Sequence, residues 1–452
     1  MSESQKGLSR DQAHELTQKI LRQSDADNCR VSVNSGWRGY TRVATNRITS
    51  AGGAEQVSVR ITSVYGKRAA TVTTTETDDA SLTAALRESE NLARIAPENP
   101  EYLPELGEQA YTDVSGYYES TGGLTTEARA RAAALGIDGA KNAGGFVASG
   151  YMDVRAGSGA VATSNGLFAY HGSTGVTSTL TVRTPDDQSS GWAGDEAADW
   201  NNIESERIAR VASEKAAAWQ GRTELEPGSY TAILEPTAVG MLMLRMMGAF
   251  SARSADEGRS YFSKPGGANR IGEPLFDERV TIVSDPAAPD AETAPFNGAG
   301  EPVARTTWVE NGVLRNLAYS RYWANETGRG SLPGPSNLVF EGGEDSVEDM
   351  IASTERGVLI TRLWYVRGLN PRIISYTGLT RDGTFLIEDG KISRPVKNFR
   401  FNQSIPEMLS NIEQLGPATR VAAGENSSVG APIVVPALKV RDFNLASVSD
   451  AI

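Results

Sequence analysis

The chain has few of the side chains that most often bind metals or carry out nucleophilic catalysis. Its 452 residues include two histidines, His14 and His171, and a single cysteine, Cys29. Histidine is the commonest metal ligand and general base in proteins, and no Gly-x-Ser-x-Gly segment is present to offer a serine nucleophile. The sequence therefore disfavours a Ser-His-Asp hydrolase. One cysteine cannot form a disulfide within the chain, which fits a reducing compartment.

The sequence also lacks long hydrophobic runs and clusters of positive charge. No window approaches the ~18 uninterrupted apolar residues of a membrane span, and the opening residues MSESQKGLSRDQAHEL lack the basic-then-apolar order of a secretory signal. The net charge is −12, without the Lys/Arg-rich run that binding to a phosphate backbone requires. We therefore expect a cytoplasmic protein with neither a membrane nor a nucleic acid as partner.

The composition that is present describes a globular chain of more than one domain. Hydrophobic residues make up 39% and charged residues 22% of the chain, as in folded proteins. Single cores stop growing near ~250–300 residues, so this length indicates two or three domains. The polar segment RTPDDQSSGWAGDEAADWNN interrupts a pattern of strands. We place the boundary there, between an N-terminal α+β domain (1–190) and a C-terminal strand-rich α+β domain (200–452).

Helices and strands are predicted in mixed order along both halves. Ser9 and Gln12 form a capping box that predicts a first helix, and Asp78 or Asp79 caps a second one. A helix at 203–220 carries Lys215 on its apolar side. Further helices are predicted at 128–143, 347–353 and 406–415, and strands at 29–33, 39–45, 56–66, 68–76, 146–182, 229–235, 278–285, 306–320, 356–366, 372–379 and 383–396. This order predicts an α+β fold with mixed and antiparallel sheets and flanking helices.

Three other features have an ordinary structural interpretation. His14 precedes a glutamate, as in a His-Glu-x-x-His zinc motif, but the second histidine is missing and a solvated helix residue is expected. His171 is predicted to lie at a strand end, hydrogen-bonded to the backbone or to water. The acidic run 341–349 lacks calcium-loop spacing, and it predicts a helix capped by Asp345 or Ser346.

The segment LEPTAVGMLMLRMMGAF, residues 234–250, holds four of the eight methionines. Pro236 suits the first turn of a helix, where no backbone donor is needed. An apolar stripe follows at helical spacing, formed by Val239, Leu242, Met243, Met246 and Phe250. Methionine fills irregular gaps in cores, and thioether copper sites need further soft ligands that are missing nearby. The segment therefore predicts a buried core helix rather than a soft-metal site.

The same segment and several others resemble the TldD/PmbA family. Its two branches are TldD, a zinc metallopeptidase, and TldE (PmbA), its partner. In the N-terminal half the resemblance lies in GWRGYTRVATNRITSAGG and LTAALRESENLARIAPENPEYLPELGEQAY. In the C-terminal half it lies in LEPTAVGM, AFSARSADEGRSYFSKPGG, GEPLFDERVTIVSD, GTFLIEDGKISRPVKNF and PALKV. The resemblance implies a two-domain TldD/PmbA-like fold.

The residues that would bind zinc in the TldD branch are replaced in this chain. The corresponding TldD segment reads Leu-Glu-His-Glu-Ala-Val-Gly-His, in which the two histidines bind zinc and the second glutamate is the general base. In this chain Pro236 and Met241 stand at the two histidine positions and Thr237 stands at the position of the general base, in the degenerate site at 234–247. The third ligand of the family, a cysteine, would fall between Ser428 and Gly430, where this chain has none. The resemblance therefore implies a TldE-like chain with no catalytic residue, metal or cofactor of its own.

Membership of the TldE branch implies a heterodimer with a TldD-like subunit that carries the zinc. The pair would enclose a passage for unfolded or linear peptides, which are cleaved at the partner's zinc. The family's older label, modulator of DNA gyrase, suggests a link to nucleic acid that the charge of this chain does not support.

Two alternatives remain open. A zinc-independent enzyme on the same scaffold would use a group of polar residues that the family places near the groove, namely Arg253, Asp256, Glu257, Arg259 and Tyr261. The ordinary interpretation of this group is a polar loop with internal ion pairs. The other alternative is a homodimer or larger homo-oligomer that binds peptides without a TldD-like partner.

Overall fold

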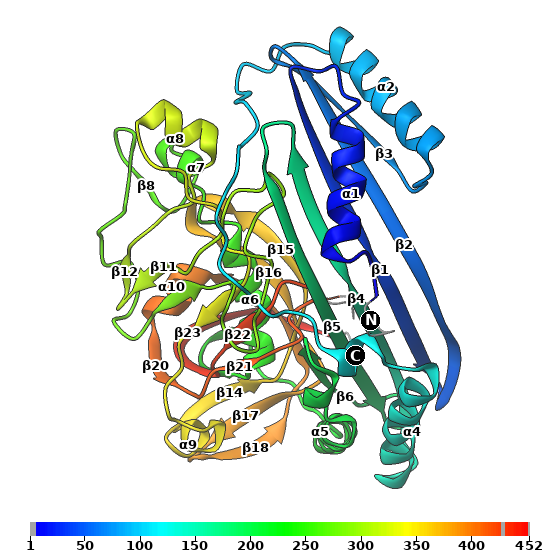
Figure 1. The fold of residues 1–452 in the computed structure, drawn as a ribbon. Coiled ribbons are helices and arrows are strands. Elements are labelled where there is room, and N and C mark those ends of the chain that lie inside the picture. Colours follow the sequence, from blue (N-terminus) through cyan, green and yellow to red (C-terminus); the bar gives the residue numbers. More distant parts are fainter. Residues whose placement is uncertain (1–5, 426–429, 451–452) are drawn as a thin grey trace.

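A computed structural model describes residues 6–425 and 430–450 of the chain. Its first sheet has six antiparallel strands in the order β3-β2-β1-β4-β5-β6. The strands are β1 (Asn28–Ala44), β2 (Arg47–Tyr65), β3 (Arg68–Thr74), β4 (Val147–Thr163), β5 (Phe168–Arg183) and β6 (Ser190–Ala197). Figure 1 shows these strands as one long twisted layer beside the rest of the chain.

Helices cover one face of this sheet because the apolar side chains of its strands alternate with polar ones. Val31 and Val33 of β1 are buried against α1 (Arg10–Leu21) and α2 (Asp79–Ile95). They pair directly with Ala162 and Ala160 of β4. Since side chains two residues apart share a face, Met152 and Val154 lie on the same side, where α4 (Thr126–Asn142) and α5 (Ser205–Ala218) cover them. The predicted capping box of α1 and the Asp78 cap of α2 are confirmed.

The polar segment 183–202, expected to interrupt the strands, instead contains the whole of β6. Its small residues allow close packing, since a Cβ on Gly191 would lie 2.2 Å from the carbonyl oxygen of Ala212 in α5. The two acids of β6, Asp195 and Glu196, are paired with arginines rather than solvated. The first sheet thus continues to Ala197, and α5 packs on it and on α4. The domain limits 1–190 and 200–452 stay a prediction.

The C-terminal half contains two further large sheets, each with one parallel pair. The larger runs β15-β16-β19-β23-β7-β14-β17-β18, with β20 also paired to β23, and β7 is parallel to β14. Its strands are β7 (Gly228–Leu234), β14 (Arg356–Ile360), β15 (Leu363–Asn370), β16 (Ser375–Thr380), β17 (Thr384–Glu388), β18 (Lys391–Pro395), β19 (Asn398–Ser404), β20 (Ile412–Leu415) and β23 (Leu438–Ser449). The smaller runs β12-β11-β10-β13-β22-β21, with β13 parallel to β22. Its strands are β10 (Ile282–Ser284), β11 (Thr306–Glu310), β12 (Val313–Leu314), β13 (Leu338–Phe340), β21 (Thr419–Arg420) and β22 (Ile433–Val435).

Helix α6 (Pro236–Met247) lies between these two sheets and contacts strands of both. Every residue of the predicted apolar stripe is at most 1% exposed, so the prediction of a core helix is confirmed. The remaining elements are short. They are α3 (Glu119–Gly122), α7 (Ala252–Asp256), α8 (Arg321–Thr327), α9 (Val347–Ala352), α10 (Ile405–Ser410), a two-stranded sheet of β8 (Ser263–Lys264) and β9 (Ala268–Asn269), and two turns of 3₁₀ helix at Trp200–Asn202 and Pro371–Ile373.

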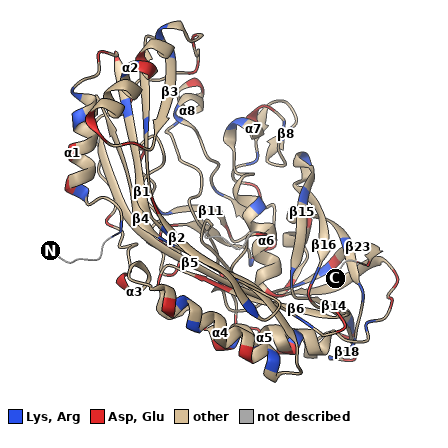
Figure 2. Cartoon of the chain, turned by 90° about the vertical axis from the view of Figure 1, so that its right-hand side faces the viewer, with Lys and Arg blue, Asp and Glu red and all other residues tan. Residues whose placement is uncertain are grey.

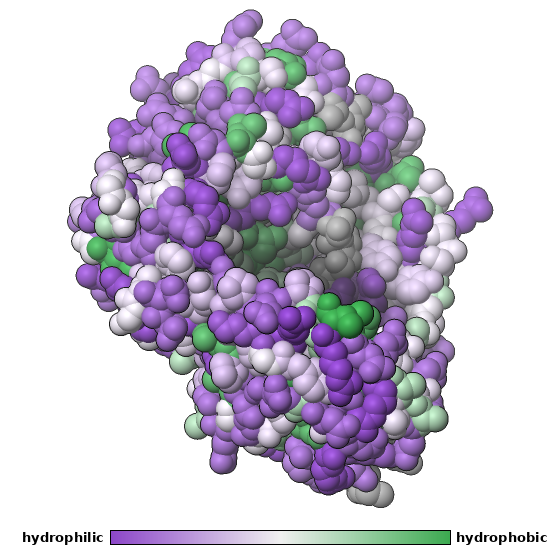
Figure 3. Space-filling view, turned by 90° about the horizontal axis from the view of Figure 1, so that it is seen from above, coloured by the Kyte–Doolittle hydropathy of each residue, from purple (hydrophilic) through white to green (hydrophobic). Residues whose placement is uncertain are grey.

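The predicted α+β class, with mixed and antiparallel sheets and flanking helices, is confirmed. The predicted cap of α9 is also confirmed, since Ser346 forms a capping box with Asp349. None of the helices in the described residues is long and apolar enough to cross a membrane. Seen from above, the surface is mostly hydrophilic, and a hollow near its middle has hydrophobic residues inside it (Figure 3).

Candidate functional site at the start of helix α6

The junction between β7 and α6 brings the degenerate motif to the edge of a cavity. Strand β7 ends at Leu234, and the backbone N–H of Glu235 donates to the carbonyl of Ile360 at 3.0 Å. Glu235 has extended backbone angles, and Pro236 then opens the helix. Proline is tolerated there because a first-turn N–H has no partner within the helix. The side chains of Glu235 and Thr237 consequently lie at the partly exposed start of an otherwise buried helix.

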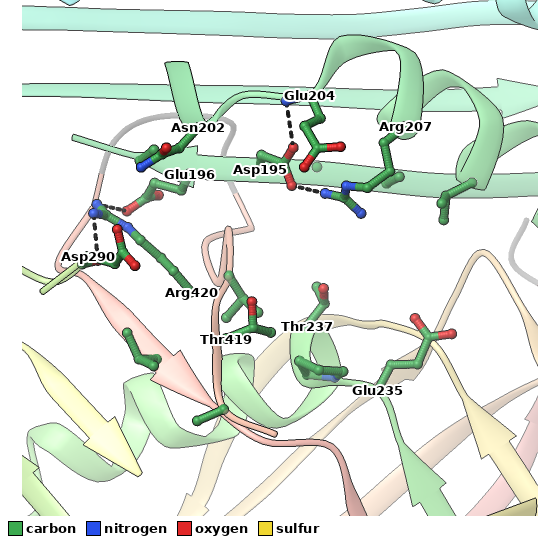
Figure 4. A pocket seen from close by; sticks show the side chains of 18 of the residues that line it. Asp195, Glu196, Asn202, Glu204, Arg207, Glu235, Thr237, Asp290, Thr419 and Arg420 are labelled. Carbon is green, nitrogen blue, oxygen red and sulfur yellow. Dashed lines mark hydrogen bonds and ion pairs between the residues drawn. The ribbon is translucent and has the colours of Figure 1, made fainter. Parts of the chain in front are cut away.

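The cavity has a volume of about 610 Å³ and lies between the first sheet and the C-terminal half. Strand β6 and one side of α5, from Arg207 to Lys215, form one wall, and residues 235–237, 289–290, 418–421 and 434 form the other. Figure 4 shows the polar side chains of both walls converging on this space. Its charged lining consists of five carboxylates and three cations, a net charge of −2; these are Asp195, Glu196, Glu204, Glu235, Asp290, Arg207, Lys215 and Arg420.

One ion pair joins the two walls beside the motif. The Nζ of Lys215 in α5 donates to Oε2 of Glu235 at 2.6 Å. The two side chains are 19% and 21% exposed, so the pair is largely removed from solvent. A charge-assisted hydrogen bond of this length is among the stronger polar contacts in proteins. The pair therefore holds the start of α6 against the helix layer of the first sheet.

A second, more deeply buried pair joins β6 to β21. Arg420 lies 3.4 Å from Oε1 of Glu196, and the two side chains are 9% and 4% exposed. Thr177 also donates to Glu196 at 3.3 Å, and Arg420 donates to the carbonyl of Asp290 at 2.8 Å. Burial raises the pKa of the Glu196 carboxyl, and the Arg420 charge opposes that rise only in part.

The remaining acids differ in whether they have a partner. Asp195 is paired with Arg207 and accepts the backbone N–H of Glu204 at 3.3 Å. Burial raises the pKa of the Asp195 carboxyl, although the Arg207 charge acts in the opposite direction. Among the described residues, the side-chain carboxylates of Glu204 and Asp290 have no ion-pair partner. These two can accept hydrogen bonds from a ligand in the cavity.

The residues at the motif positions do not fit a zinc ion. Proline has no ligand atom, and a threonine hydroxyl is no general base near neutral pH. Met241 is 2% exposed and packed in the core rather than in the cavity. The nearby Glu235 carboxylate is held by the Lys215 ammonium. No group of three or more His, Cys, Asp and Glu residues that could hold a metal occurs within 6–425 and 430–450, and Ser428, at the predicted third position, lies outside those residues.

The polar residues that the sequence offered as groove candidates lie at the opposite end of α6, in and after α7. Arg253 donates twice to Glu101 and once to Glu257, each at 2.9 Å. Arg259 pairs with the same Glu257, and these hydrogen bonds lower the pKa of the Glu257 carboxyl. The arrangement is an ion-pair network of the kind given above as the ordinary interpretation. None of the group lines the cavity at the start of α6.

The other two candidates are held by aromatic and amide partners. Asp256 accepts hydrogen bonds from the Nε1 of Trp323 and the Nδ2 of Asn269, both at 2.8 Å. The ring of Tyr261 packs against the core, with the Arg270 guanidinium 5.0 Å from its centroid. Both contacts fix the loop after α7, and neither leaves a side chain aimed into the cavity at the start of α6.

Apart from the motif residues Pro236 and Thr237, the residues that line that cavity were not predicted as a site from the sequence. For Lys215 the sequence contained one indication of a special role, namely that it is a cation on the apolar side of a predicted helix. Glu196 and Arg420 are 224 residues apart in the chain, and no local pattern connects them. The histidines lie elsewhere: His14 is exposed, as predicted, whereas His171 lies inside β5 rather than at a strand end. Its Nε2 is buried without a partner in the described structure, and burial lowers its pKa.

Comparison with known proteins relates the second half of the chain to metallopeptidases. Residues 227–447 match the family described as the PmbA/TldA metallopeptidase C-terminal domain. A metalloprotease of Methanothermobacter thermautotrophicus is 26% identical over 260 residues, which cover 52% of this chain and 54% of the relative. The metalloprotease TldD homolog of Buchnera aphidicola is 21% identical over 201 residues, 39% of this chain and 40% of that protein. The chain spans about half the length of the first of these relatives.

Solved structures extend the likeness in fold to almost the whole chain. TldE from Thermococcus kodakarensis has a TM-score of 0.83 at 18% identity, covering 96% of this chain and 99% of that one. A candidate modulator of DNA gyrase from Thermotoga maritima has a TM-score of 0.81 at 19% identity, covering 95% and 99%. The resemblance inferred from the sequence is therefore confirmed, in the C-terminal half by the family match and over nearly the whole chain by the fold.

Proposed function

We propose that the chain is the non-catalytic subunit of a two-chain zinc metallopeptidase of TldD/TldE type, and the premise is that residues 227–447 match the PmbA/TldA metallopeptidase C-terminal domain family. The substrate class would be unfolded or linear peptides. A TldD-like subunit would supply the zinc, its ligands and the general base. This chain would bind and orient the peptide and complete the walls of the passage.

The observation that carries the proposal is the chemistry at the start of α6. The helix begins at the edge of a cavity large enough for several peptide atoms, yet it presents Pro236 and Thr237 there. The acid beside them, Glu235, is neutralised by Lys215 at 2.6 Å. A carboxylate held in that way is a poor base and a poor ligand, since both roles need its lone pairs. The cavity is therefore suited to holding a chain rather than to cleaving it.

Two sheet edges at the cavity favour an extended peptide as the ligand. Strand β6 ends the first sheet and β21 ends the smaller C-terminal sheet, and residues of both line the cavity. Edge strands carry backbone N–H and C=O groups that an extended chain can pair with. The Glu204 and Asp290 carboxylates add acceptors for backbone N–H groups or for a peptide amine. These groups together provide polar contacts that do not depend on one side-chain sequence.

The test is co-production of this chain with the TldD-like chain of the same genome. We expect a stable complex that hydrolyses a fluorogenic linear peptide, while neither chain does so alone. Replacing Thr237 by Ala in this chain should leave turnover within about twofold, whereas Glu→Gln at the general base of the partner should abolish it. If no complex forms, or if hydrolysis by the partner is indifferent to this chain, the proposal is wrong.

The same preparation separates the two alternatives. Turnover by the isolated chain after metal removal, lost on Glu257→Gln, would support a zinc-independent enzyme. A homodimer that binds the peptide and ignores the TldD-like chain would support a self-sufficient binding protein.

A further inference from the structure

A second cavity lies at the other end of α6, and its charged lining is of one sign. It has a volume of about 660 Å³ and is formed by the last turn of α6, the segment after α7 and the turn between β15 and β16. Three arginines line it, Arg245, Arg259 and Arg372, and the described lining includes no carboxylate. Figure 2 shows basic residues on α6, on α7 and at the upper end of β15, in a chain whose net charge is −12. We call this space the arginine cavity.

Arg245 has little compensation for its charge. Its Nη2 lies 3.6 Å from Oε1 of Glu425, beyond hydrogen-bond distance. That carboxylate is already bound by Arg367 at 2.9 and 3.0 Å and by the backbone N–H of Val366 at 2.7 Å. The Nε of Arg245 is buried and has no partner within the described residues. A buried guanidinium N–H without an acceptor is costly. The side chain as a whole is 33% exposed and lines the cavity, so the outer part of the guanidinium can reach an anion that enters.

The other two arginines differ in how far their charge is compensated. Arg259 is paired with Glu257, which also accepts from Arg253, and Arg253 is in turn paired with Glu101. Arg372 is exposed, and its guanidinium forms no ion pair or hydrogen bond with any described residue. A planar guanidinium offers two parallel N–H groups that match the two oxygens of a carboxylate. Two or three such groups around one space therefore recognise a carboxylate better than they recognise a neutral group.

The rest of the lining suits the end of a peptide. Asn370, Ser260 and Ser375 offer polar atoms, and Pro371 and Ile374 provide an apolar wall. Ile374 has φ +44, a left-handed conformation that is costly for a β-branched residue. The turn is held in this conformation partly by the N–H of Ile405, which donates to the Ile374 carbonyl at 3.1 Å. The wall is thus fixed before any ligand arrives.

We propose that the arginine cavity binds the carboxylate of a linear peptide, either at its C-terminus or on an acidic side chain. The inference rests on the proposed function, which brings peptides to this chain. It adds a second recognition site, separated from the cavity with the degenerate motif by about 18 Å, which is the length of the 12-residue helix α6. A nucleic acid fits less well, because a polyanion would be repelled by the overall negative charge.

The test measures binding by the full isolated chain with fluorescence anisotropy. The probe is a short Gly/Ser peptide that ends in leucine and carries a dye on its N-terminus. It is used as the free acid, as the C-terminal amide, and as the amide with one internal glutamate. We expect the free acid to bind at least about tenfold more tightly than the plain amide, because one charge-assisted contact is worth about that factor. Affinity should also fall as salt is raised.

Two variants locate the site. Arg372→Gln should weaken binding of the free acid to the level of the amide. Arg356→Gln, which alters another exposed arginine at the start of β14, should leave it unchanged. If the amide with the internal glutamate binds as tightly as the free acid, the site recognises acidic side chains. If that amide binds more weakly than the free acid, the site recognises the C-terminus.

Three results would overturn the proposal: equal binding of all three probes, no binding of any probe, or an unchanged affinity in Arg372→Gln. Protection against urea by inorganic phosphate without binding of any peptide would also overturn it. These outcomes are independent of complex formation with a TldD-like chain, so the failure of this inference is distinguishable from failure of the proposed function.

Discussion

The Lys215–Glu235 pair allows the geometry of the candidate site to be tested quantitatively. Its atoms are 2.6 Å apart and each side chain is about four-fifths buried. Lys215→Met keeps the aliphatic stem but leaves the Glu235 carboxylate uncompensated in a cavity whose net charge then becomes −3. A charge-assisted hydrogen bond contributes about 1.5–3 kcal/mol net, so we expect this variant to lose about 2 kcal/mol of unfolding free energy. Glu235→Gln should lose about 1 kcal/mol because an amide can still accept from the ammonium.

The assay is urea unfolding followed by tryptophan fluorescence, in a double-mutant cycle. The double variant should be more stable than the sum of the two single losses implies, with a coupling energy of about 1 kcal/mol. The matched control is the exposed i, i+4 pair Arg210–Glu214, at 3.3 Å with both side chains 61% exposed. Its coupling should stay below about 0.5 kcal/mol. If the Lys215–Glu235 coupling is no larger than that of the control, the pair does not hold α6 in solution and the reasoning fails.

Three further predictions concern single positions. Burial raises the pKa of Glu196 above its ordinary 4.5, so the folded chain binds the carboxyl proton more tightly than the unfolded chain does. The stability that the neutral carboxyl contributes is therefore lost as pH rises from 4.5 through the raised pKa of the folded state. The stability advantage of the native chain over Glu196→Gln should therefore shrink from pH 4.5 upward in urea titrations; an advantage that grows would contradict the burial. Met241→His places a polar ring at a position that is 2% exposed, and it should cost about 2 kcal/mol without producing a zinc site, as urea unfolding and metal analysis can check. Gly191→Ala should cost more than about 2 kcal/mol because its Cβ would meet the Ala212 carbonyl at 2.2 Å, whereas Gly298→Ala, with open space around it, should be nearly neutral in thermal unfolding.

Local signals in the sequence were sufficient for most individual elements. The capping box at Ser9, the Asp78 cap and the stripe from Val239 to Phe250 each predicted a helix that the structure contains. Such signals succeed because a cap or an amphipathic stripe is satisfied by residues three or four positions away. Strand β6 was not predicted from local signals. Its acidic residues indicated a polar boundary segment, because their partners, Arg207 and Arg420, are not evident from the sequence of the strand itself.

The candidate site was predicted only where it coincides with one local segment. The departure of Pro236, Thr237 and Met241 from the zinc motif is visible in the sequence, whereas the cavity in front of them is not. That cavity joins residues from β6, α5, α6 and β21, and its contacts depend on how separate layers pack. The groove candidates around Arg253 stay a prediction, and Arg259 is the one among them that lines the arginine cavity. Charged residues close in sequence suggested a site, but mutual pairing satisfies most of them in the structure.

The most direct test of the account is the zinc content of the purified chains, measured by elemental analysis with peptide hydrolysis followed on the same samples. We predict less than about one zinc per ten molecules of this chain alone, and close to one per pair in the complex with the TldD-like chain, where hydrolysis also occurs. Stoichiometric zinc in the isolated chain, together with hydrolysis, would contradict the assignment of this chain as the non-catalytic subunit.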